Sequence, residues 1–153
     1  MLGKQRLQWG AFGAACVILA AVAGLGAAPA PAPVIIVYKS ATCGCCKQWV
    51  AHLSAAGFQV ITHDTPDLDA VMTELGVPRQ LAACHTAVVQ GYAIEGHVPA
   101  DLIQRLLQER PRVAGLAVPG MPAGSPGMQS GAATPYQVLT FDSAGKTTVY
   151  ATR

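Results

Sequence analysis

The sequence is poor in charge and lacks the basic clusters that bind nucleic acid. Charged residues make up 12% of its 153 residues, and none lies between Arg6 and Lys39. Residues 1–28 hold two of the ten basic residues and no acidic one, so the remainder has eight basic and eight acidic residues and no formal net charge. This balance predicts no nucleic-acid partner, because such partners are bound through a basic patch or stripe.

Two other absences narrow the function. The spacing of the polar residues suggests no Ser-His-Asp set and no pair of carboxylates for acid–base catalysis. No internal repeat is visible, and a chain of 153 residues leaves no room for two large domains. The chemistry of this chain must therefore be sought in other residues.

The N-terminus predicts export. Lys4 and Arg6 precede an apolar run at residues 9–28, an order typical of a secretory signal, and the run is long enough to remain as a membrane anchor. Prolines that follow each small-residue cleavage point should hinder a peptidase, but the signal-peptide pattern as a whole favours cleavage. We therefore interpret residues 1–28 as a signal peptide or an uncleaved anchor, followed by a stiff Pro/Ala spacer at residues 29–33. Either outcome carries the domain across the membrane, but only an uncleaved anchor tethers it to that membrane.

Hydrophobic periodicity predicts an α/β domain over residues 34–112. The expected elements are a strand at 34–38 covered on both faces, a helix from Cys43 to its cap at Gly57, a strand at 58–62, a helix capped by Thr65 and ended by Gly76, a hairpin of strands at 86–90 and 92–95, and a helix from His97-Val98-Pro99 to Pro111. The order β-α-β-α-β-β-α is that of thioredoxin.

The composition changes after this domain. Residues 113–135 contain five glycines and four prolines without periodicity, so we expect no helix or strand there but a long loop that carries Met121 and Met128. Residues 136–141 and 147–151 flank a turn and predict a terminal β-hairpin. Residues 113–153 are expected to pack on the same domain.

Four of the five cysteines can meet in such a fold. Cys16 lies in the export segment, and we interpret it as a small apolar residue. Cys43 and Cys46 have the spacing of a thioredoxin-type redox pair at the start of a helix, where free backbone N–H groups favour thiolate. Cys45 replaces the proline common there. Cys84 precedes the third strand, which should place it across from Cys43–Cys46, so that four sulfurs converge.

Three interpretations of these cysteines remain open. Structural disulfides suit an exported protein, but pairing Cys43 with Cys46 leaves Cys45 to bridge to Cys84. A thiol–disulfide oxidoreductase would use Cys43 and Cys46 and leave Cys45 without a role. The interpretation we favour is a metal-binding protein rather than an enzyme, because four thiolates suit a soft ion. Copper(I) fits better than zinc, because neighbouring cysteines crowd one tetrahedral ion whereas thiolates can bridge several coppers in a neutral cluster.

Methionine and histidine add candidate ligands. Met121 and Met128 carry thioethers, which bind copper(I), although they could instead dock the loop on apolar surface. His85, beside Cys84, is a candidate ligand or a partner that orients one. His97 is a candidate ligand or a cap of the third helix. Met72 is expected in the core, and His52 and His63 at the surface or at strand ends.

Several separated motifs resemble one family. They are Val37-Tyr38-Lys39-Ser40, Thr42-Cys-Gly-Cys-Cys-Lys47, Cys84-His85-Thr86, Glu95-Gly-His-Val-Pro99, Val118-Pro-Gly-Met-Pro122 and Gly124-Ser-Pro-Gly-Met128. In this order they look like the CopG-type copper-resistance proteins of Gram-negative bacteria, long known as a domain of unknown function, and the resemblance spans about residues 34–150.

The resemblance implies a thioredoxin-like fold that holds a multinuclear copper–thiolate cluster. The family's three clustered cysteines match Cys43, Cys45 and Cys46, and its distant fourth matches Cys84. It also implies a role in periplasmic copper tolerance, with copper ions and other periplasmic copper-handling proteins as partners.

Overall fold

The computed structural model describes residues 31–129 and 132–153. The predicted export segment and the first two residues of the spacer lie outside the described residues. Within the described ranges, no helix has both the length and the apolar character needed to cross a membrane.

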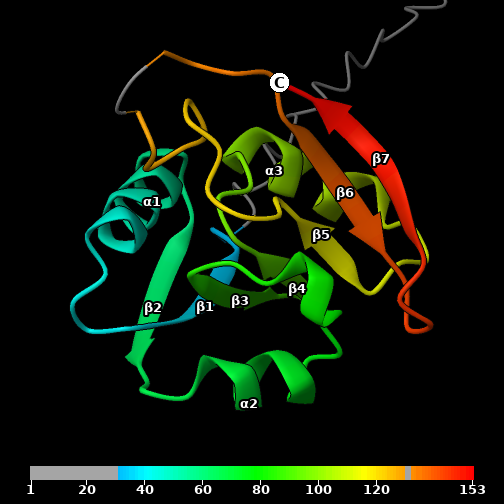
Figure 1. Ribbon diagram of the computed structural model, residues 1–153, viewed down its shortest axis with the longest axis horizontal. Coiled ribbons are helices and arrows are strands. Elements are labelled where there is room, and N and C mark those ends of the chain that lie inside the picture. The colour runs from blue at the N-terminus through cyan, green and yellow to red at the C-terminus, as the bar shows by residue number, and fades with distance from the viewer. Residues whose placement is uncertain (1–30, 130–131) are drawn as a thin grey trace, which may run out of the picture. The chain divides into compact units, whose positions relative to one another are not determined.

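A single mixed sheet of seven strands organises the described chain (Figure 1). Its strands, in spatial order, are β2 (Gln59–Asp64), β1 (Val34–Lys39), β3 (His85–Val89), β4 (Tyr92–Glu95), β5 (Gly115–Ala117), β6 (Gln137–Phe141) and β7 (Thr147–Thr152). The β1–β2 and β4–β5 pairs are parallel and the other four pairs are antiparallel. The element order through the third helix is the predicted β-α-β-α-β-β-α, apart from a short 3₁₀ turn at Arg79–Leu81.

Helices cover both faces of the sheet. Helices α1 (Gly44–Ala55) and α3 (Ala100–Glu109) lie on one face and α2 (Leu68–Glu74) on the other (Figure 1). The larger core joins Trp49 and Leu53 of α1 and Leu106 of α3 to inward-facing strand residues. A smaller core gathers Met72 of α2 with its neighbours, as expected for Met72. Two layers of helix around one sheet bury apolar side chains on alternate strand positions.

Strand β1 is central in the sheet, but its two faces differ. Ile35 and Val37 are fully buried, whereas Val34 is 42% exposed and Ile36 is half-buried. The prediction that both faces of this strand are covered therefore holds fully on one face and only in part on the other. The continuous apolar run gave no sign of this, because a run without alternation does not show which face is open.

The prediction of no strand within residues 113–135 was also wrong. Strand β5, only three residues long, pairs with both β4 and β6 and so completes the sheet. Gly115 is required in it, because a Cβ atom there would lie 1.9 Å from the carbonyl oxygen of Ala93. Pairing on both edges, which a local pattern does not record, stabilises this short segment.

The helix ends also differ in detail from the predictions. Asp67, not Thr65, caps α2 by accepting a hydrogen bond from the Ala70 N–H, while Thr65 accepts one from the Asp67 N–H. Gly57 and Gly76 follow their helices with positive φ angles of 92° and 66°, as predicted for C-terminal caps. The terminal hairpin of β6 and β7 forms as expected.

Candidate metal centre

The start of α1 presents three sulfur atoms. Cys43 is the N-cap residue, with extended backbone, and its Sγ accepts the Cys46 N–H at 3.3 Å. Cys45 and Cys46 occupy the first turn, where N–H groups have no partner within the helix. The Sγ atoms of Cys43 and Cys45 are 3.4 Å apart. A helix beginning at this motif therefore gathers thiols at an end that favours negative charge.

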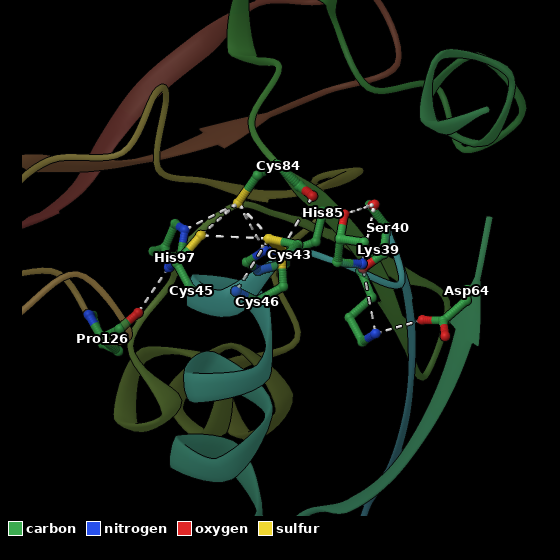
Figure 2. The surroundings of a disulfide bond; sticks show 11 residues. Lys39, Ser40, Cys43, Cys45, Cys46, Asp64, Cys84, His85, His97 and Pro126 are labelled. Carbon is green, nitrogen blue, oxygen red and sulfur yellow. Dashed lines mark hydrogen bonds and ion pairs between the residues drawn. A yellow bond between two sulfur atoms is a disulfide. The ribbon is translucent and has the colours of Figure 1, made fainter. Parts of the chain in front are cut away.

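The sheet brings the fourth sulfur to the same place. Strands β1 and β3 are antiparallel, and Lys39 at the end of β1 pairs with His85 at the start of β3. Cys84, just before β3, therefore lies beside the turn that leads from β1 to α1. Its Sγ is 3.7 Å from that of Cys45 and 3.5 Å from that of Cys46 (Figure 2). The four sulfurs all lie within 4.8 Å of one another, as the sequence predicted.

Two of these cysteines are bonded to each other. Cys43 and Cys46 form a disulfide with their Cα atoms 5.4 Å apart, and Cys45 and Cys84 are free thiols (Figure 2). The Cys43–Cys46 pair of the disulfide interpretation is thus present, whereas the Cys45–Cys84 bridge is not. Reduction of this bond is required before all four sulfurs can act as thiolate ligands.

The thiol of Cys84 lies in an environment that disfavours its charged form. Burial raises the pKa of Cys84 to about 12, and the neighbouring Cys45 adds to the shift. Without a cation nearby, Cys84 is therefore a thiol at neutral pH. A metal ion would have to displace this proton in order to bind the sulfur.

His97 lies beside Cys84 and does not cap a helix. Its Nε2 is 3.1 Å from the Cys84 Sγ, and its Nδ1 is 2.8 Å from the Pro126 carbonyl oxygen (Figure 2). The N-cap of α3 is Pro99, and the interpretation of His97 as a cap was wrong. Burial lowers the pKa of His97, so its ring is neutral. A fully buried neutral imidazole next to a thiol is suited to ligation or to a hydrogen bond with the sulfur.

His85 is fully buried, as are His97 and Glu95. Its Nδ1 is 3.4 Å from the Cys84 Sγ, and its ring lies 4.3 Å from that of Trp49, centroid to centroid. Burial, with a smaller effect of His97, lowers the pKa of His85 to about 3. Its Nε2 is the one buried side-chain nitrogen or oxygen without a hydrogen-bond partner among residues 31–129 and 132–153.

The two histidines expected at the surface or at strand ends differ. His63 is exposed on the edge strand β2, beside Tyr38, as predicted. His52 is half-buried, and its Nε2 accepts the Ala100 N–H at 3.0 Å. It therefore performs the capping role that the sequence suggested for His97. A side chain from another helix cannot be assigned as a cap from local spacing.

Glu95, which the sequence reasoning did not identify as a site residue, fixes the segment that carries Cys84. Its fully buried carboxylate accepts the Ala83 N–H at 2.7 Å and the Thr86 hydroxyl at 2.6 Å. Burial raises the pKa of Glu95 to about 7, against the lowering effect of these two hydrogen bonds. An acid at the end of an otherwise apolar strand, inside the Glu95-Gly-His-Val-Pro99 motif, was the signal that could have identified it.

The glycine- and proline-rich loop packs against the sulfur cluster. Gly127 has φ of +90°, and a Cβ atom there would lie 2.7 Å from the Cys45 carbonyl oxygen and 3.2 Å from the His97 Nδ1. Only glycine allows this approach and this backbone angle. The loop thus supplies both a close backbone contact to α1 and, through Pro126, the acceptor for His97.

The two candidate methionines occupy different places. Met128 lines a pocket of about 450 Å³ together with Gly44, Cys45, Gln48, Gly127 and Gln129. Met121 is 52% exposed and lies outside that pocket. The structure therefore brings Met128, and not Met121, to the accessible side of the cysteines.

Together these features define a small mixed α/β protein with a cysteine cluster that could hold a metal ion. Two solved structures of the copper resistance protein CopG are similar to it. Form 2 has 46% sequence identity and a TM-score of 0.76, and form 1 has 47% identity and a TM-score of 0.75. Each alignment covers 80% of this chain and 98% of the other.

The chain therefore belongs to the CopG family, as the motifs suggested. The sequence profile of a protein family of unknown function, DUF411, also matches residues 81–128. That segment contains Cys84, both buried histidines and Met128, but not the cysteines of α1. A comparison with curated protein sequences gives no match.

Proposed function

We propose that this chain is a periplasmic copper(I)-binding protein that acts in copper tolerance. In this proposal the ion is bound by the thiolates of Cys43, Cys45, Cys46 and Cys84. The observation that carries the proposal is the convergence of four sulfurs within 4.8 Å of one another. Membership of a family whose solved members are named copper resistance proteins supports copper as the metal.

The donor set favours copper(I) over zinc. Thiolates are soft ligands, and the spacings of 3.4 to 3.7 Å between the sulfurs leave room for bridging ions. Cys45 and Cys46 are adjacent in sequence, which is awkward around a single tetrahedral ion but suits thiolates that each bridge two coppers. One copper(I) per thiolate would leave the cluster neutral, which reduces the cost of placing it in a partly buried site. We therefore expect a multinuclear site.

Met128 and His97 are proposed as additional groups around this cluster. Met128 lines the pocket beside Cys45, so that its thioether can bind copper(I) on the accessible side. His97 is next to Cys84 and is held by the Pro126 carbonyl. Met121 is the weaker candidate because it lies outside this pocket. The source of the copper is proposed to be another periplasmic copper-handling protein, in keeping with the predicted export signal.

A second function, thiol–disulfide exchange, has a specific observation in its favour. Cys43 and Cys46 form a disulfide at a helix N-terminus, the position at which redox pairs are activated. Cys45 separates the two functions. It would be a ligand in a copper cluster and would have no role in two-electron exchange.

Anaerobic titration of the full, reduced chain with copper(I), against a competing chelator, tests the proposal. We expect more than one copper(I) per chain, and saturation below one ion would rule out a cluster. Cys45→Ser is expected to lower the number of ions bound, whereas an oxidoreductase would keep its exchange activity. Cys16→Ser, in the predicted export segment, is the matched cysteine control and should bind as much copper as the native chain.

A further inference from the structure

Among the described residues, the sheet ends on two edge strands, β2 and β7, that are built differently (Figure 1). At β7 the register with β6 shifts between Val138 and Leu139, and Lys146 and Arg153 flank the strand. Bulges and basic residues are devices by which proteins keep an exposed edge from pairing with another chain. Strand β2 has an unbroken register with β1 and contains neither proline nor lysine. The β2 edge therefore lacks this protection.

The backbone of β2 offers three residues to a further strand. The N–H groups of Gln59 and Thr65, at the two ends of the strand, donate to carbonyl groups on the β1 side. Because the direction of hydrogen bonding alternates along a strand, the N–H and C=O groups of Val60, Thr62 and Asp64 point away from β1. No strand of the described chain lies on that side.

The side chains of β2 are exposed and carry little net charge. Asp64 is the one acid of the strand, and it is ion-paired with Lys39, whose side chain is 7% exposed. Ile61 is 42% exposed, and the ring of His63 stacks on that of Tyr38. A regular edge strand with a neutralised acid and an exposed isoleucine is suited to pairing with another strand.

We propose that β2 is a dimer interface, at which it pairs antiparallel with β2 of a second copy of this chain. The two-fold axis passes beside Thr62, which then faces Thr62 of the partner copy, while Val60 faces Asp64 of the partner copy. All three outward residues of each strand are engaged, which gives about six backbone hydrogen bonds. Sliding one strand by two residues in either direction leaves an outward residue of each copy without a partner in the other strand.

The side chains favour this register. Ile61 lies opposite His63 of the partner copy in a non-hydrogen-bonded pair, the kind in which side chains across an antiparallel ladder approach most closely. Each exposed isoleucine is thus covered by an imidazole that already stacks on Tyr38. The acid Asp64 faces an apolar residue and not its own copy, so no like charges meet.

A second copy fits this edge better than an open series of chains. The antiparallel contact uses the same strand of both copies, so it closes after two chains. The other edge of each copy is the bulged strand β7, which does not continue the sheet. A contact along one strand falls below the roughly 1,200 Å² of stable interfaces, so we expect a weak dimer.

This inference does not rest on the proposed copper(I) cluster. Strands β1 and β2 are parallel, and the cysteine motif follows the end of β1. Antiparallel pairing of two β2 strands therefore places the two cysteine clusters at opposite ends of the joined sheet. The number of copper(I) ions bound per chain should be the same in the monomer and the dimer, so either proposal can fail while the other stands.

Sedimentation equilibrium of the full chain tests the dimer, in a mild detergent because of the predicted export segment. We expect the average mass to rise towards two chains between about 5 and 500 μM, as for a weak complex. Thr62→Pro should weaken association at least about tenfold, because it removes the central N–H of both copies, although an edge strand tolerates proline where its nitrogen faces solvent. Thr62→Val, which keeps the N–H and the branched side chain, is the matched control and should associate like the native chain.

Photo-cross-linking locates the contact without changing Thr62. A photoreactive amino acid in place of His63 should link to residues 59–64 of the second copy, identified by mass spectrometry in a mixture of isotope-labelled and unlabelled chains. The same probe in place of Val149, which is 52% exposed on β7, is the control and should give no link between copies.

Three results would overturn the dimer. They are a chain that stays monomeric over the whole concentration range, an association that Thr62→Pro leaves unchanged, and links from position 63 that fall outside β2 of the second copy. The first result would leave the β2 edge free for a strand of a different protein. The second and third would assign self-association to another part of the chain.

Discussion

The smaller core beneath α2 and the end of the sheet near Cys84 are built differently. The smaller core is apolar and includes Met72, Leu81 and Phe141. Near Cys84, polar groups are buried on both faces of the sheet: His85 lies on the face of α1 and α3, and Glu95, which pairs with Ala117 of the smaller core, lies on the face of α2. Of the seven buried polar residues in the described ranges, all but Thr140 lie in the segments around the sulfur cluster: Lys39, His85, Thr86, Glu95, His97 and Ser125.

This difference separates stability from function. Burying polar groups costs free energy unless they are hydrogen-bonded, so a region needed only for stability is best filled with apolar residues. The smaller core of Met72, Leu81 and Phe141 follows that rule. At the end of the sheet near Cys84 polar residues are buried instead, and the thiols of the cluster lie at this same end. The predictions below test whether the two regions can be damaged independently.

The largest loss of stability is expected from Met72→Ala on the α2 face. Met72 is 7% exposed, and truncating a buried methionine to alanine usually costs about 2–5 kcal/mol. Urea unfolding should show this loss, while the number of copper(I) ions bound to the folded chain should not change. A fall in copper stoichiometry in the folded variant would show that the two regions are coupled.

Glu95→Ala should destabilise the protein by about 2–4 kcal/mol, because it leaves two buried donors, the Ala83 N–H and the Thr86 hydroxyl, without an acceptor. Glu95→Gln keeps an oxygen for one of them and should lose less. Urea unfolding measures both changes, and Glu74→Ala, on the exposed end of α2, is the control. Equal losses for the Gln and Ala variants would mean that the charge, and not the hydrogen bonds, holds this segment.

Cys84→Ser is expected to have the opposite effect to Met72→Ala: a loss of bound copper(I) with little loss of stability. Removing the Cys84 sulfur should lower the copper(I) bound by at least one ion per chain, while the free energy of unfolding changes by less than about 1.5 kcal/mol, as for most substitutions at half-buried positions. Chelator competition and urea unfolding measure the two quantities. Unchanged stoichiometry would remove Cys84 from the copper site.

A smaller, kinetic effect is expected from Met128→Leu. Leucine keeps the apolar volume but lacks the thioether. Copper(I) transfer from a chelator to the reduced chain should therefore slow by roughly threefold, a small effect because the thioether is a weaker ligand than the thiolates. Met121→Leu is the matched control, because that side chain lies outside the Cys45 pocket. Stopped-flow absorbance follows the transfer. Equal rates for the two variants would assign both methionines to loop packing.

The smallest effect concerns His52 and pH. Burial lowers the pKa of His52 in the folded chain, against a raising effect of Asp101, and its neutral ring accepts the Ala100 N–H. The unfolded chain takes up this proton first, so the contribution of His52 makes stability fall as pH drops below about 6.5, whereas Glu95, with its raised pKa, acts in the opposite direction. In His52→Ala this fall should be less steep, while the contributions of His85 and His97, with the same sign, remain. Unfolding curves at several pH values compare the slopes, and identical slopes would contradict the role of His52.

Sequence reasoning was most successful where structure depends on neighbours along the chain. The apolar strands, the helix that begins at the cysteine motif and the terminal hairpin each follow from local periodicity and turn residues. It failed where a partner comes from elsewhere. Strand β5 exists because two other strands pair with it, and the N-terminus of α3 is capped by a histidine of α1.

The spacing of the sequence by itself determined that Cys43, Cys45 and Cys46 share one helix start, because successive residues of a first turn cannot be far apart. The order of strands and helices made a meeting with Cys84 expected. Only the tertiary structure decided that both His85 and His97 turn towards Cys84, that Glu95 holds its segment, and that Met128 rather than Met121 lies beside Cys45. Side-chain direction and long-range contact depend on how the whole sheet packs, and no local pattern records them.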